Sequence, residues 1–148
     1  MLFRRYTQQD QDACMALIDS NMDKYFVPGE RDEFHEFLKT RPKDYYVIEA
    51  TDGEILACGG IHVNESGVGS LRWGMSHRQR HGLGLGGMLT QGRLELIRAN
   101  PNARTVLLDT SQHTFGFYEK FGFQVTNIIR NGLGPNLHTY EMKLDLHR

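Results

Sequence analysis

The sequence predicts an α+β fold in which helices cover both faces of a mixed, mainly antiparallel sheet of about seven strands. The chain has 148 residues, of which 39% are hydrophobic and 24% charged, which is the composition of an ordinary globular domain. The spacing of its apolar residues alternates between the steps of helices and those of strands, in the order βααβββαβαββ. Because no stretch is rich enough in Pro, Gly or Ser to be a linker, we expect residues 1–148 to form a single domain.

The first half of the chain is expected to contain strands and two helices. A short strand over residues 2–6 precedes Thr7, a suitable N-cap for a helix with apolar residues at helical spacing. A second helix is expected after Pro28, with acidic residues in its early turns, where the helix dipole favours them. Asp52 and Gly53 predict a type I′ turn between the next two strands, since that turn requires positive φ. These strands and the one that follows them cover residues 45–50, 55–64 and 71–76.

The second half is expected to contain two helices and three strands. The longer helix should end at Asn100 because Pro101 follows it, and the shorter helix should end at Gly122. In the last strand the alternate residues from His138 to Leu146 are mostly apolar, which predicts one buried face. The helices cover residues 84–100 and 114–121, and the strands cover residues 105–110, 123–129 and 137–146, with a loop at 131–136.

Charge and apolar patterning exclude several classes of protein. Lys and Arg total 17 against 18 for Asp and Glu, so the net charge of −1 favours neither nucleic acid nor a membrane surface. Apolar runs fall far below the roughly 18–20 residues of a membrane span, and the N-terminus lacks the apolar region of a signal peptide. Cys14 and Cys58 are expected to be buried thiols in a reducing compartment. We therefore expect a cytoplasmic protein without nucleic-acid, membrane or metal partners.

A glycine-rich loop over residues 77–87 is the most informative stretch of the sequence. It lies where a strand passes to a helix, and the N–H groups at a helix start lack intrahelical partners and attract anions. Gly82 and Gly84 would allow a sharp turn and the close approach of a phosphate. Residues 66–94 contain no Asp or Glu. The arginines within that window are Arg72, Arg78, Arg80 and Arg93. The loop therefore predicts a site for a diphosphate.

Other interpretations of this loop are less consistent with the sequence. The glycines could serve packing alone, but packing does not require an acid-free flank. His77 and His81 have the spacing of metal ligands, yet the neighbouring arginines oppose a cation and no carboxylate completes the set. A Walker loop is excluded because no Gly-Lys-Ser/Thr follows. The glycines match the dinucleotide pattern GxGxxG, and Asp109 lies 22 residues after Gly87, but the 39 residues beyond Asp109 are too few for a doubly wound sheet.

The same loop also contains the pattern QxxGxG, formed by Gln79, Gly82 and Gly84. With the following helix, this pattern resembles the acetyl-CoA signature, (Gln/Arg)xxGx(Gly/Ala), of the GNAT superfamily of N-acetyltransferases. The run YEKFGF, Tyr118–Phe123, looks like that family's second conserved block. The element order agrees along essentially the whole chain, while the sequence-specific resemblance is limited to residues 71–123. The resemblance implies the GNAT-like acyl-CoA N-acyltransferase fold and the use of acetyl-CoA.

The resemblance also implies how coenzyme A is held. In this family the diphosphate lies on the loop amides, and the pantetheine arm adds to the fourth strand like another strand. Gly74 would mark a bulge that opens the sheet. A cofactor-binding Asn of the family is replaced here by Ser111, whose shorter hydroxyl could still donate a hydrogen bond. The implied cofactor-binding residues are Trp73, Met75, Ser76, Gln79, Arg80, His81, Gly82, Leu83, Gly84, Leu85, Ser111 and Tyr118.

The catalytic residues are implied in the same way. Acetyl transfer needs a neutral amine, stabilisation of an oxyanion and a proton for the departing thiolate. Tyr118 matches the family's general acid, although it could also be a core aromatic residue, and a backbone N–H near Met75 would stabilise the oxyanion. Many relatives supply a Glu base from the fourth strand, which has none here. Asp109, His62 and His113 are the candidate substitutes, and each also has an ordinary structural interpretation.

The sequence thus predicts an N-acetyltransferase that moves an acetyl group from acetyl-CoA to a primary amine of a small molecule or peptide, by direct attack in a ternary complex. Two alternatives remain, namely an acyl-CoA-binding module without turnover and a dinucleotide-binding oxidoreductase. The resemblance implies that the first two helices and the loop at 131–136 shape the acceptor side, where Glu30 and Asp32 could attract a cationic amine. The exposed edges of the sheet would also allow a homodimer.

Overall fold

The computed structural model describes residues 1–22, 26–80 and 82–147. Its chain divides into two compact units: unit 1 is Met1–Ile61 with Leu71–Glu95, and unit 2 is His62–Ser70 with Leu96–Arg148. Strands and α-helices follow in the predicted order, which is confirmed. The elements are β1 (Leu2–Arg5), the 3-10 turn η1 (Gln8–Asp10), α1 (Gln11–Asn21), α2 (Pro28–Lys39), β2 (Tyr45–Glu49), β3 (Ile55–Val63), β4 (Val68–Ser76), the 3-10 turn η2 (Arg78–Arg80), α3 (Leu85–Ala99), β5 (Thr105–Thr110), α4 (Phe115–Glu119), β6 (Gln124–Gly134) and β7 (Leu137–Asp145).

The strands form a seven-stranded mixed sheet of order β1-β2-β3-β4-β5-β7-β6. Antiparallel ladders join β1 to β2, β2 to β3, β5 to β7 and β7 to β6. β4 and β5 run parallel, and their register pairs Val68 with Thr105 and Gly69 with Val106. The prediction of a mixed, mainly antiparallel sheet is therefore confirmed.

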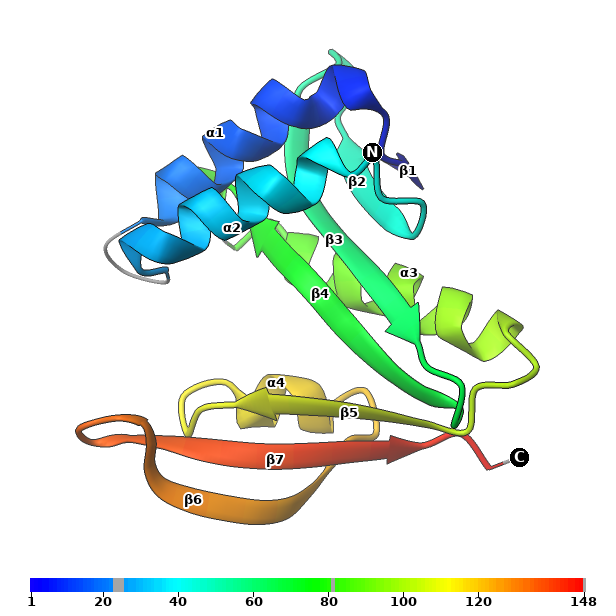
Figure 1. The fold of residues 1–148 in the computed structure, drawn as a ribbon, viewed down its shortest axis with the longest axis vertical. Helices are drawn as coiled ribbons and strands as arrows, with labels where there is room; N and C mark the ends of the chain where they lie inside the picture. Colours follow the sequence, from blue (N-terminus) through cyan, green and yellow to red (C-terminus); the bar gives the residue numbers. More distant parts are fainter. Residues whose placement is uncertain (23–25, 81, 148) are drawn as a thin grey trace. The chain divides into compact units, whose positions relative to one another are not determined.

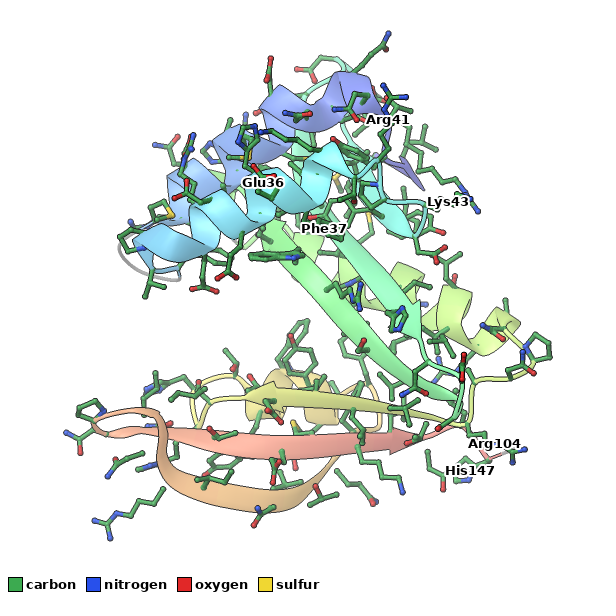
Figure 2. All side chains as sticks on the ribbon, viewed as in Figure 1. Glu36, Phe37, Arg41, Lys43, Arg104 and His147 are labelled. Carbon is green, nitrogen blue, oxygen red and sulfur yellow. The ribbon has the colours of Figure 1, made fainter. Side chains whose placement is uncertain are left out.

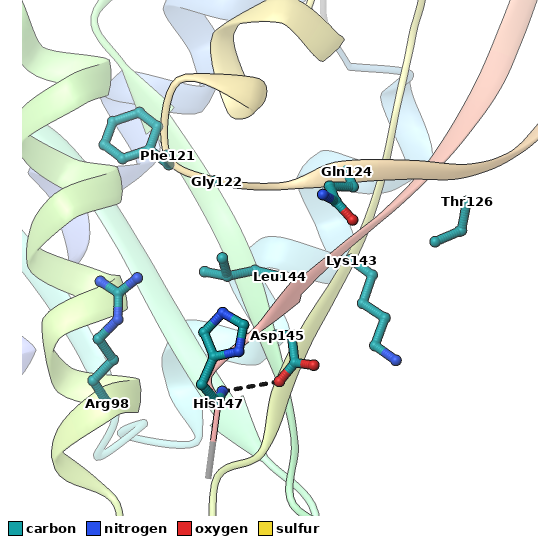
Figure 3. A pocket seen from close by; sticks show the side chains of 9 residues that line it. All are labelled: Arg98, Phe121, Gly122, Gln124, Thr126, Lys143, Leu144, Asp145 and His147. Atoms are coloured by element: carbon teal, nitrogen blue, oxygen red, sulfur yellow. Dashed lines mark hydrogen bonds between the residues drawn. The ribbon is translucent and has the colours of Figure 1, made fainter.

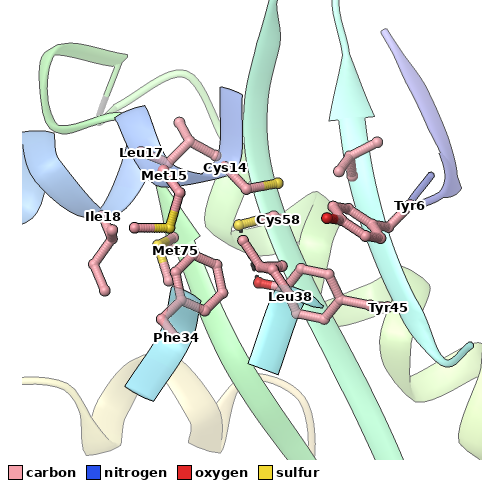
Figure 4. Packing of buried hydrophobic residues seen from close by; sticks show 11 residues of the cluster. Tyr6, Cys14, Met15, Leu17, Ile18, Phe34, Leu38, Tyr45, Cys58 and Met75 are labelled. Carbon is pink, nitrogen blue, oxygen red and sulfur yellow. Dashed lines mark hydrogen bonds between the residues drawn. The ribbon is translucent and has the colours of Figure 1, made fainter. Parts of the chain in front are cut away.

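The core of unit 1 lies on both faces of β2 and β3. α1 and α2 cover one face and α3 covers the other (Figure 1). Because β2 is covered on both sides, its residues Tyr45–Ile48 are all buried, which explains their unbroken apolar run. The cluster beneath α1 and α2 comprises Tyr6, Cys14, Met15, Leu17, Ile18, Phe34, Leu38, Tyr45, Val47, Cys58 and Met75 (Figure 4). The cluster beneath α3 comprises Ile48, Leu56, Ala57, Leu85 and Leu89.

The inward and outward faces of α2 follow the amphipathic pattern of its sequence. Phe37 packs against Trp73 of β4, with their ring centroids 6.4 Å apart. Glu36, the preceding residue, leaves 72% of its side chain exposed (Figure 2). Within the described ranges, no helix has the length and apolar composition required to cross a membrane.

Unit 2 contains α4 and the antiparallel strands β5, β7 and β6 (Figure 1). As the alternation along β7 predicts, Met142 and Leu144 are buried. The Phe115 ring of α4 stacks on Tyr140 with a centroid distance of 4.6 Å, which ties the short helix to the sheet. Thr139 falls on the predicted polar face but is buried, because β6 passes over it at Gly132.

One local prediction in unit 1 is wrong, and a second, the N-cap at Thr7, holds for a 3-10 turn and not for the α-helix itself. The β2–β3 turn is not type I′, because Gly53 has a φ of 91° but Asp52 does not have a positive φ. The Ala50 carbonyl accepts the Gly53 N–H at 2.9 Å, so the glycine takes the left-handed position of a longer loop. Thr7 leads into a 3-10 turn rather than directly into an α-helix, and the Asp10 carboxylate accepts its backbone N–H at 2.8 Å.

Three element boundaries also differ from the prediction by two residues or more. β4 begins at Val68 rather than Leu71, because its first residues pair with β5. β6 continues to Gly134, where it pairs with Leu137, so most of the predicted loop is strand. α4 ends at Glu119, before the Gly122 that the sequence marks as its stop.

Candidate active site

The residues predicted to form the site fall into two groups, one in each unit. Unit 1 holds the β4 residues and the glycine-rich loop, and unit 2 holds the proposed acid and the candidate bases. The unit 1 group is Trp73, Met75, Ser76, Gln79, Arg80, Gly82, Leu83, Gly84 and Leu85. The unit 2 group is His62, Asp109, Ser111, His113 and Tyr118. His81 lies outside the described residues.

The glycine bend at Gly82 and Gly84 is open to solvent. Their φ angles are 93° and 78°, in the left-handed region that glycine adopts without strain. A Cβ built on either glycine would meet no atom of the other described residues within 4 Å, its chain neighbours aside. Leu83 between them is 57% exposed, whereas Leu85, the first residue of α3, is 2% exposed and anchors the helix start in the core. The bend is therefore not folded against the core, and the start of α3 is held firmly behind it.

The segment before the bend is fixed by other elements of unit 1. The His77 N–H donates to the Leu56 carbonyl at 3.0 Å, and the Arg78 N–H donates to Ser20 Oγ at 3.2 Å. The Arg80 N–H closes the turn on the His77 carbonyl at 2.8 Å. Gln79 is exposed on this turn, with its backbone N–H 3.2 Å from His77 Nδ1. β3 and α1 thus determine where the loop leaves β4.

The positive charge of the loop is partly neutralised. Arg80 contacts both carboxylate oxygens of Glu54, at 2.9 and 3.2 Å. Glu54 comes from the β2–β3 turn. An acidic side chain therefore lies beside the loop, although residues 66–94 contain none. Both side chains of this pair are exposed, so the contact contributes little to stability. An anionic ligand can replace Glu54 as the partner of Arg80. Arg78 is exposed on the same turn.

β4 departs from regular strand geometry at Trp73, where φ is 45°. The sequence places a bulge at Gly74, but the left-handed residue is Trp73. Gly74 allows the close approach of Arg93, because a Cβ there would lie 2.8 Å from the guanidinium. Met75 is buried, and the Ser76 carbonyl accepts the Asn21 side-chain amide at 2.8 Å. One of the two lone pairs of the Ser76 carbonyl is therefore already engaged.

Tyr118 lies on α4, half-buried among aromatic rings of unit 2. Its ring packs edge-on against Phe117 and Phe123, with centroid distances of 5.1 and 5.9 Å. The backbone around it closes the helix, because the Tyr118 carbonyl accepts the N–H groups of Phe121 and Phe123. The packing thus holds the phenol in one orientation, which both interpretations of this residue, acid and core aromatic, require.

Among the candidate bases, Asp109 has a neighbour that the sequence analysis missed. Asp109 is exposed on β5 and pairs across the ladder with Glu141 of β7, which places the two side chains on one face. Glu141 Oε1 accepts the Asn127 amide at 2.7 Å. The alternation along β7 put Glu141 on the polar face, and only the register shows that it faces Asp109. His62 is exposed at the end of β3.

The loop between β5 and α4 is shaped by short-range hydrogen bonds. Ser111 Oγ accepts the His113 N–H at 3.1 Å, so one lone pair of this hydroxyl has a local role. Gln112 donates to the Asn136 carbonyl at 2.7 Å and accepts the His138 N–H at 2.9 Å. Its side chain thereby ties the start of α4 to the β6–β7 hairpin. No sequence pattern around Gln112 predicts its contacts with Asn136 and His138.

The groups of the glycine bend fit a diphosphate ligand. They supply open space beside two glycines, the unpaired N–H groups at the start of a 15-residue helix, and nearby arginines. No group of His, Cys, Asp and Glu in the described ranges has the arrangement of a metal site.

A family model and several solved structures resemble this chain. The sequence model of the acetyltransferase (GNAT) family matches residues 14–123. No curated protein sequence matches this chain. An aminoglycoside 6′-N-acetyltransferase solved with coenzyme A is 14% identical, with a TM-score of 0.80, over 100% of this chain and 98% of that one.

Two further solved structures belong to enzymes that are named for other acceptors. A ribosomal-protein-alanine N-acetyltransferase from Brucella melitensis is 17% identical, with a TM-score of 0.79, over 98% of this chain and 99% of that one. A spermidine N-acetyltransferase chimera from Vibrio cholerae is 15% identical, with a TM-score of 0.80, over 98% and 95%. At such identities the likeness establishes the fold, and the acceptors differ from one structure to the next.

Proposed function

This chain belongs to the acetyltransferase (GNAT) family and uses acetyl-CoA, and we propose that it moves the acetyl group to a primary amine of a small molecule or peptide by direct attack in a ternary complex. The open bend at Gly82 and Gly84 is the observation that supports this function best. It presents helix N–H groups beside two glycines whose surroundings, among the residues that the structure describes, are open.

The proposed donor site combines the bend with β4. Backbone N–H groups of the described loop residues from Arg80 to Leu85 would hold the diphosphate, with Arg78 and Gln79 beside them. The backbone of Trp73, Met75 and Ser76 would hold the pantetheine arm, and Ser111 a further part of the cofactor. The bound cofactor supplies an acetyl group as a thioester.

The chain's own residues would then perform the transfer. A backbone N–H near Met75 donates a hydrogen bond to the oxygen on which negative charge develops. Tyr118 donates its phenolic proton to the departing sulfur. Asp109 or His62 removes the proton that the attacking amine loses, directly or through water. The position of Glu141 beside Asp109 supports a carboxylate in this role, since paired carboxylates favour an incoming cationic amine.

The acceptor is proposed to be a cationic amine. Glu30 and Asp32 lie on α2, one of the elements that the family uses for its acceptors, and the Asp109–Glu141 pair adds two acids on β5 and β7. The aminoglycoside, peptide and polyamine enzymes of similar fold cover the classes to be screened.

We also propose a homodimer and a cytoplasmic location. β6 is at the edge of the sheet order and exposes Ile128, Ile129 and Leu133, which supports pairing with a second copy. Cys14 and Cys58 are free and buried, which supports a reducing compartment. Light scattering during size-exclusion chromatography, with Ile129→Lys as the variant expected to dissociate, tests the dimer.

The test of the proposed function is calorimetric binding of coenzyme A followed by a thiol-release assay. We expect binding of coenzyme A, no shift of the melting temperature with NAD(H), and turnover with at least one amine in a panel of polyamines, amino acids, aminoglycosides and peptides. Gly84→Ala should weaken the binding of coenzyme A about tenfold, because a Cβ disfavours the left-handed conformation and projects into the proposed diphosphate site. Gly29→Ala, at an open position of α2 without positive φ, is the matched control.

Binding without turnover of any amine in the panel would contradict the catalytic proposal and favour a sensing module. Absence of coenzyme A binding would overturn the proposed donor site altogether.

A further inference from the structure

β4 contains an unusual backbone feature, which we call the Trp73–Gly74 kink. Trp73 has a φ of 45°, a conformation that an aromatic residue adopts only when its surroundings hold it there. Its indole packs against Phe34 of α2, with the ring centroids 5.2 Å apart. The peptide group between Trp73 and Gly74 also has a contact of its own.

Tyr45 provides that contact. Its hydroxyl donates a hydrogen bond of 2.7 Å to the Trp73 carbonyl, and it also lies 3.1 Å from Cys58 Sγ. Tyr45 is completely buried between α2 and the sheet. Burial raises the pKa of the phenol well above its ordinary value, so the hydroxyl keeps its proton and remains a donor at every physiological pH.

This hydrogen bond determines the direction of a backbone donor. The Trp73 carbonyl and the Gly74 N–H belong to one planar trans peptide group, in which they point in opposite directions. With the carbonyl held by Tyr45, the Gly74 N–H points away from the buried hydroxyl. The Tyr45 hydroxyl on β2 therefore determines the direction of the Gly74 N–H on β4, next to Met75.

A buried cation lies against the same residue. The Arg93 side chain of α3 is 4% exposed, and its guanidinium nitrogens would lie 2.8 and 2.9 Å from a Cβ on Gly74. The same guanidinium would lie 3.2 Å from a Cβ on Gly59 of β3. Glycine at both positions allows this approach, and the cation brings positive potential to the α-carbon of Gly74, where the interior screens it less than water would.

We infer that Tyr45 and Arg93 are positioning residues of the acetyl-transfer site: together they hold the Trp73–Gly74 kink so that the Gly74 N–H polarises the acyl oxygen of the donor. The inference rests on the proposed function and adds to it two buried residues from β2 and α3. Neither residue touches the substrate, and each acts through the backbone of β4.

The decisive measurement is the carbonyl stretching frequency of ¹³C-labelled acetyl-CoA bound to the protein. We expect the frequency to fall on binding to the native protein, and Tyr45→Phe to reverse most of that fall because the peptide plane loses its anchor. For the same variant we expect kcat to fall about tenfold, and the dissociation constant of coenzyme A to change less than about twofold. Thermal unfolding checks that each variant is folded.

Matched variants separate positioning from stability. Cys58→Ala removes the other neighbour of the Tyr45 hydroxyl and should leave the carbonyl frequency and kcat unchanged. Arg93→Met should reduce the polarisation of the carbonyl, whereas Arg93→Lys, which keeps the charge, should restore most of it. A variant that only loses stability would lower the melting temperature without moving the carbonyl frequency.

The possible failures are distinguishable. Native carbonyl frequency and native kcat in folded Tyr45→Phe would overturn the inference while leaving the acetyltransferase intact. Absence of acetyl-CoA binding by the native protein would overturn the proposed function, and the inference with it.

Discussion

Tyr118 and Tyr45 carry the same phenol in different surroundings, and the surroundings assign them different chemistry. Tyr45 is buried, and its hydroxyl donates a hydrogen bond to a fixed backbone acceptor, the Trp73 carbonyl. Tyr118 is half-buried, and its ring is held by Phe117 and Phe123. Tyr118 lies near the end of a short helix, and its ring is held in place. We propose that its phenol donates a proton to the departing thiolate.

Replacement of Tyr118 by phenylalanine should therefore reduce kcat about a hundredfold, because general acid catalysis contributes factors of that order. The dissociation constant of coenzyme A should stay unchanged. Steady-state kinetics of thiol release, together with calorimetry, measures both quantities. Tyr140→Phe, another half-buried phenol of unit 2, is the control. Full turnover by Tyr118→Phe would return Tyr118 to its interpretation as a core aromatic residue.

The cysteines illustrate the effect of burial on reactivity. Both thiols are free and fully buried, as the sequence predicts. A hydrogen bond with Cys58, together with burial, raises the pKa of the Cys14 thiol well above its ordinary value (Figure 4). We expect neither thiol to react with a chromogenic disulfide reagent while the protein is native, and both to react in denaturant. Stoichiometric labelling of the native protein would contradict this packing.

At the scale of elements, an ionic network connects β1, η1 and β2. Arg4 binds both oxygens of Asp10 at 2.9 Å and also contacts Glu49 at 3.2 Å. Burial raises the pKa of Asp10, but the hydrogen bonds from Arg4 and Thr7 together outweigh it and hold the pKa below its ordinary value of 3.8. The charged carboxylate therefore stabilises the fold above that pH, and this contribution is lost as the pH falls through the lowered pKa.

Asp10→Asn should lower the free energy of unfolding by about 2 kcal/mol at neutral pH, because it weakens charge-assisted hydrogen bonds in a buried position. The difference from the native protein should shrink as the pH falls below about 3.8, because the unfolded carboxylate then takes up a proton, and it should be lost once the pH passes the lowered pKa of the folded protein. Urea denaturation at pH 7 and pH 3 tests the sign. Asp12→Asn, at an exposed position of α1, should change stability by less than about 0.5 kcal/mol. An equal effect of both variants would contradict the role of the network.

A second element-scale feature is the cationic pocket at the carboxyl end of β7. It has a volume of about 400 Å³ and lies between Arg98 of α3, the turn after α4 and the end of β7 (Figure 3). Asp145 Oδ1 accepts the His147 backbone N–H at 2.9 Å, which shapes its floor. None of the predicted site residues that the structure describes lines this pocket. The proposed function therefore does not use it.

At the scale of the whole molecule, three elements run through both units. β4 has its first residues in unit 2 and its remainder in unit 1, and β3 and α3 are also shared. A continuous hydrogen-bonded element cannot melt halfway without losing the cooperativity of its ladder or helix. We propose on this basis that residues 1–148 form one folding domain.

The expected outcome is a single unfolding transition. Fluorescence of Trp73, the one tryptophan of the chain, reports on unit 1, while far-ultraviolet circular dichroism reports on both units. The two melting curves should coincide, and coenzyme A should raise both midpoints together. Two separated midpoints would show that the units are independent domains.

Much of the fold could be predicted because local signals are strong here. The 105–110 strand was predicted with its observed bounds, since an apolar run there follows a clear helix stop at Pro101. The bends at Gly82 and Gly84 could be predicted because only glycine adopts such φ values freely. The β2–β3 turn was misjudged, because Asp-Gly is compatible with several turn types and the register of the flanking strands selects one.

By itself the sequence determined the element order, the buried faces and the glycine bend, since each depends on residues within a few positions of one another. Only the tertiary structure decided what those elements meet. It brought Glu54 to Arg80 across 26 positions, Tyr45 to Trp73 across 28, and Glu141 opposite Asp109. Such contacts follow from strand register and helix packing, which depend on the shape of the whole core and are not encoded in any short pattern.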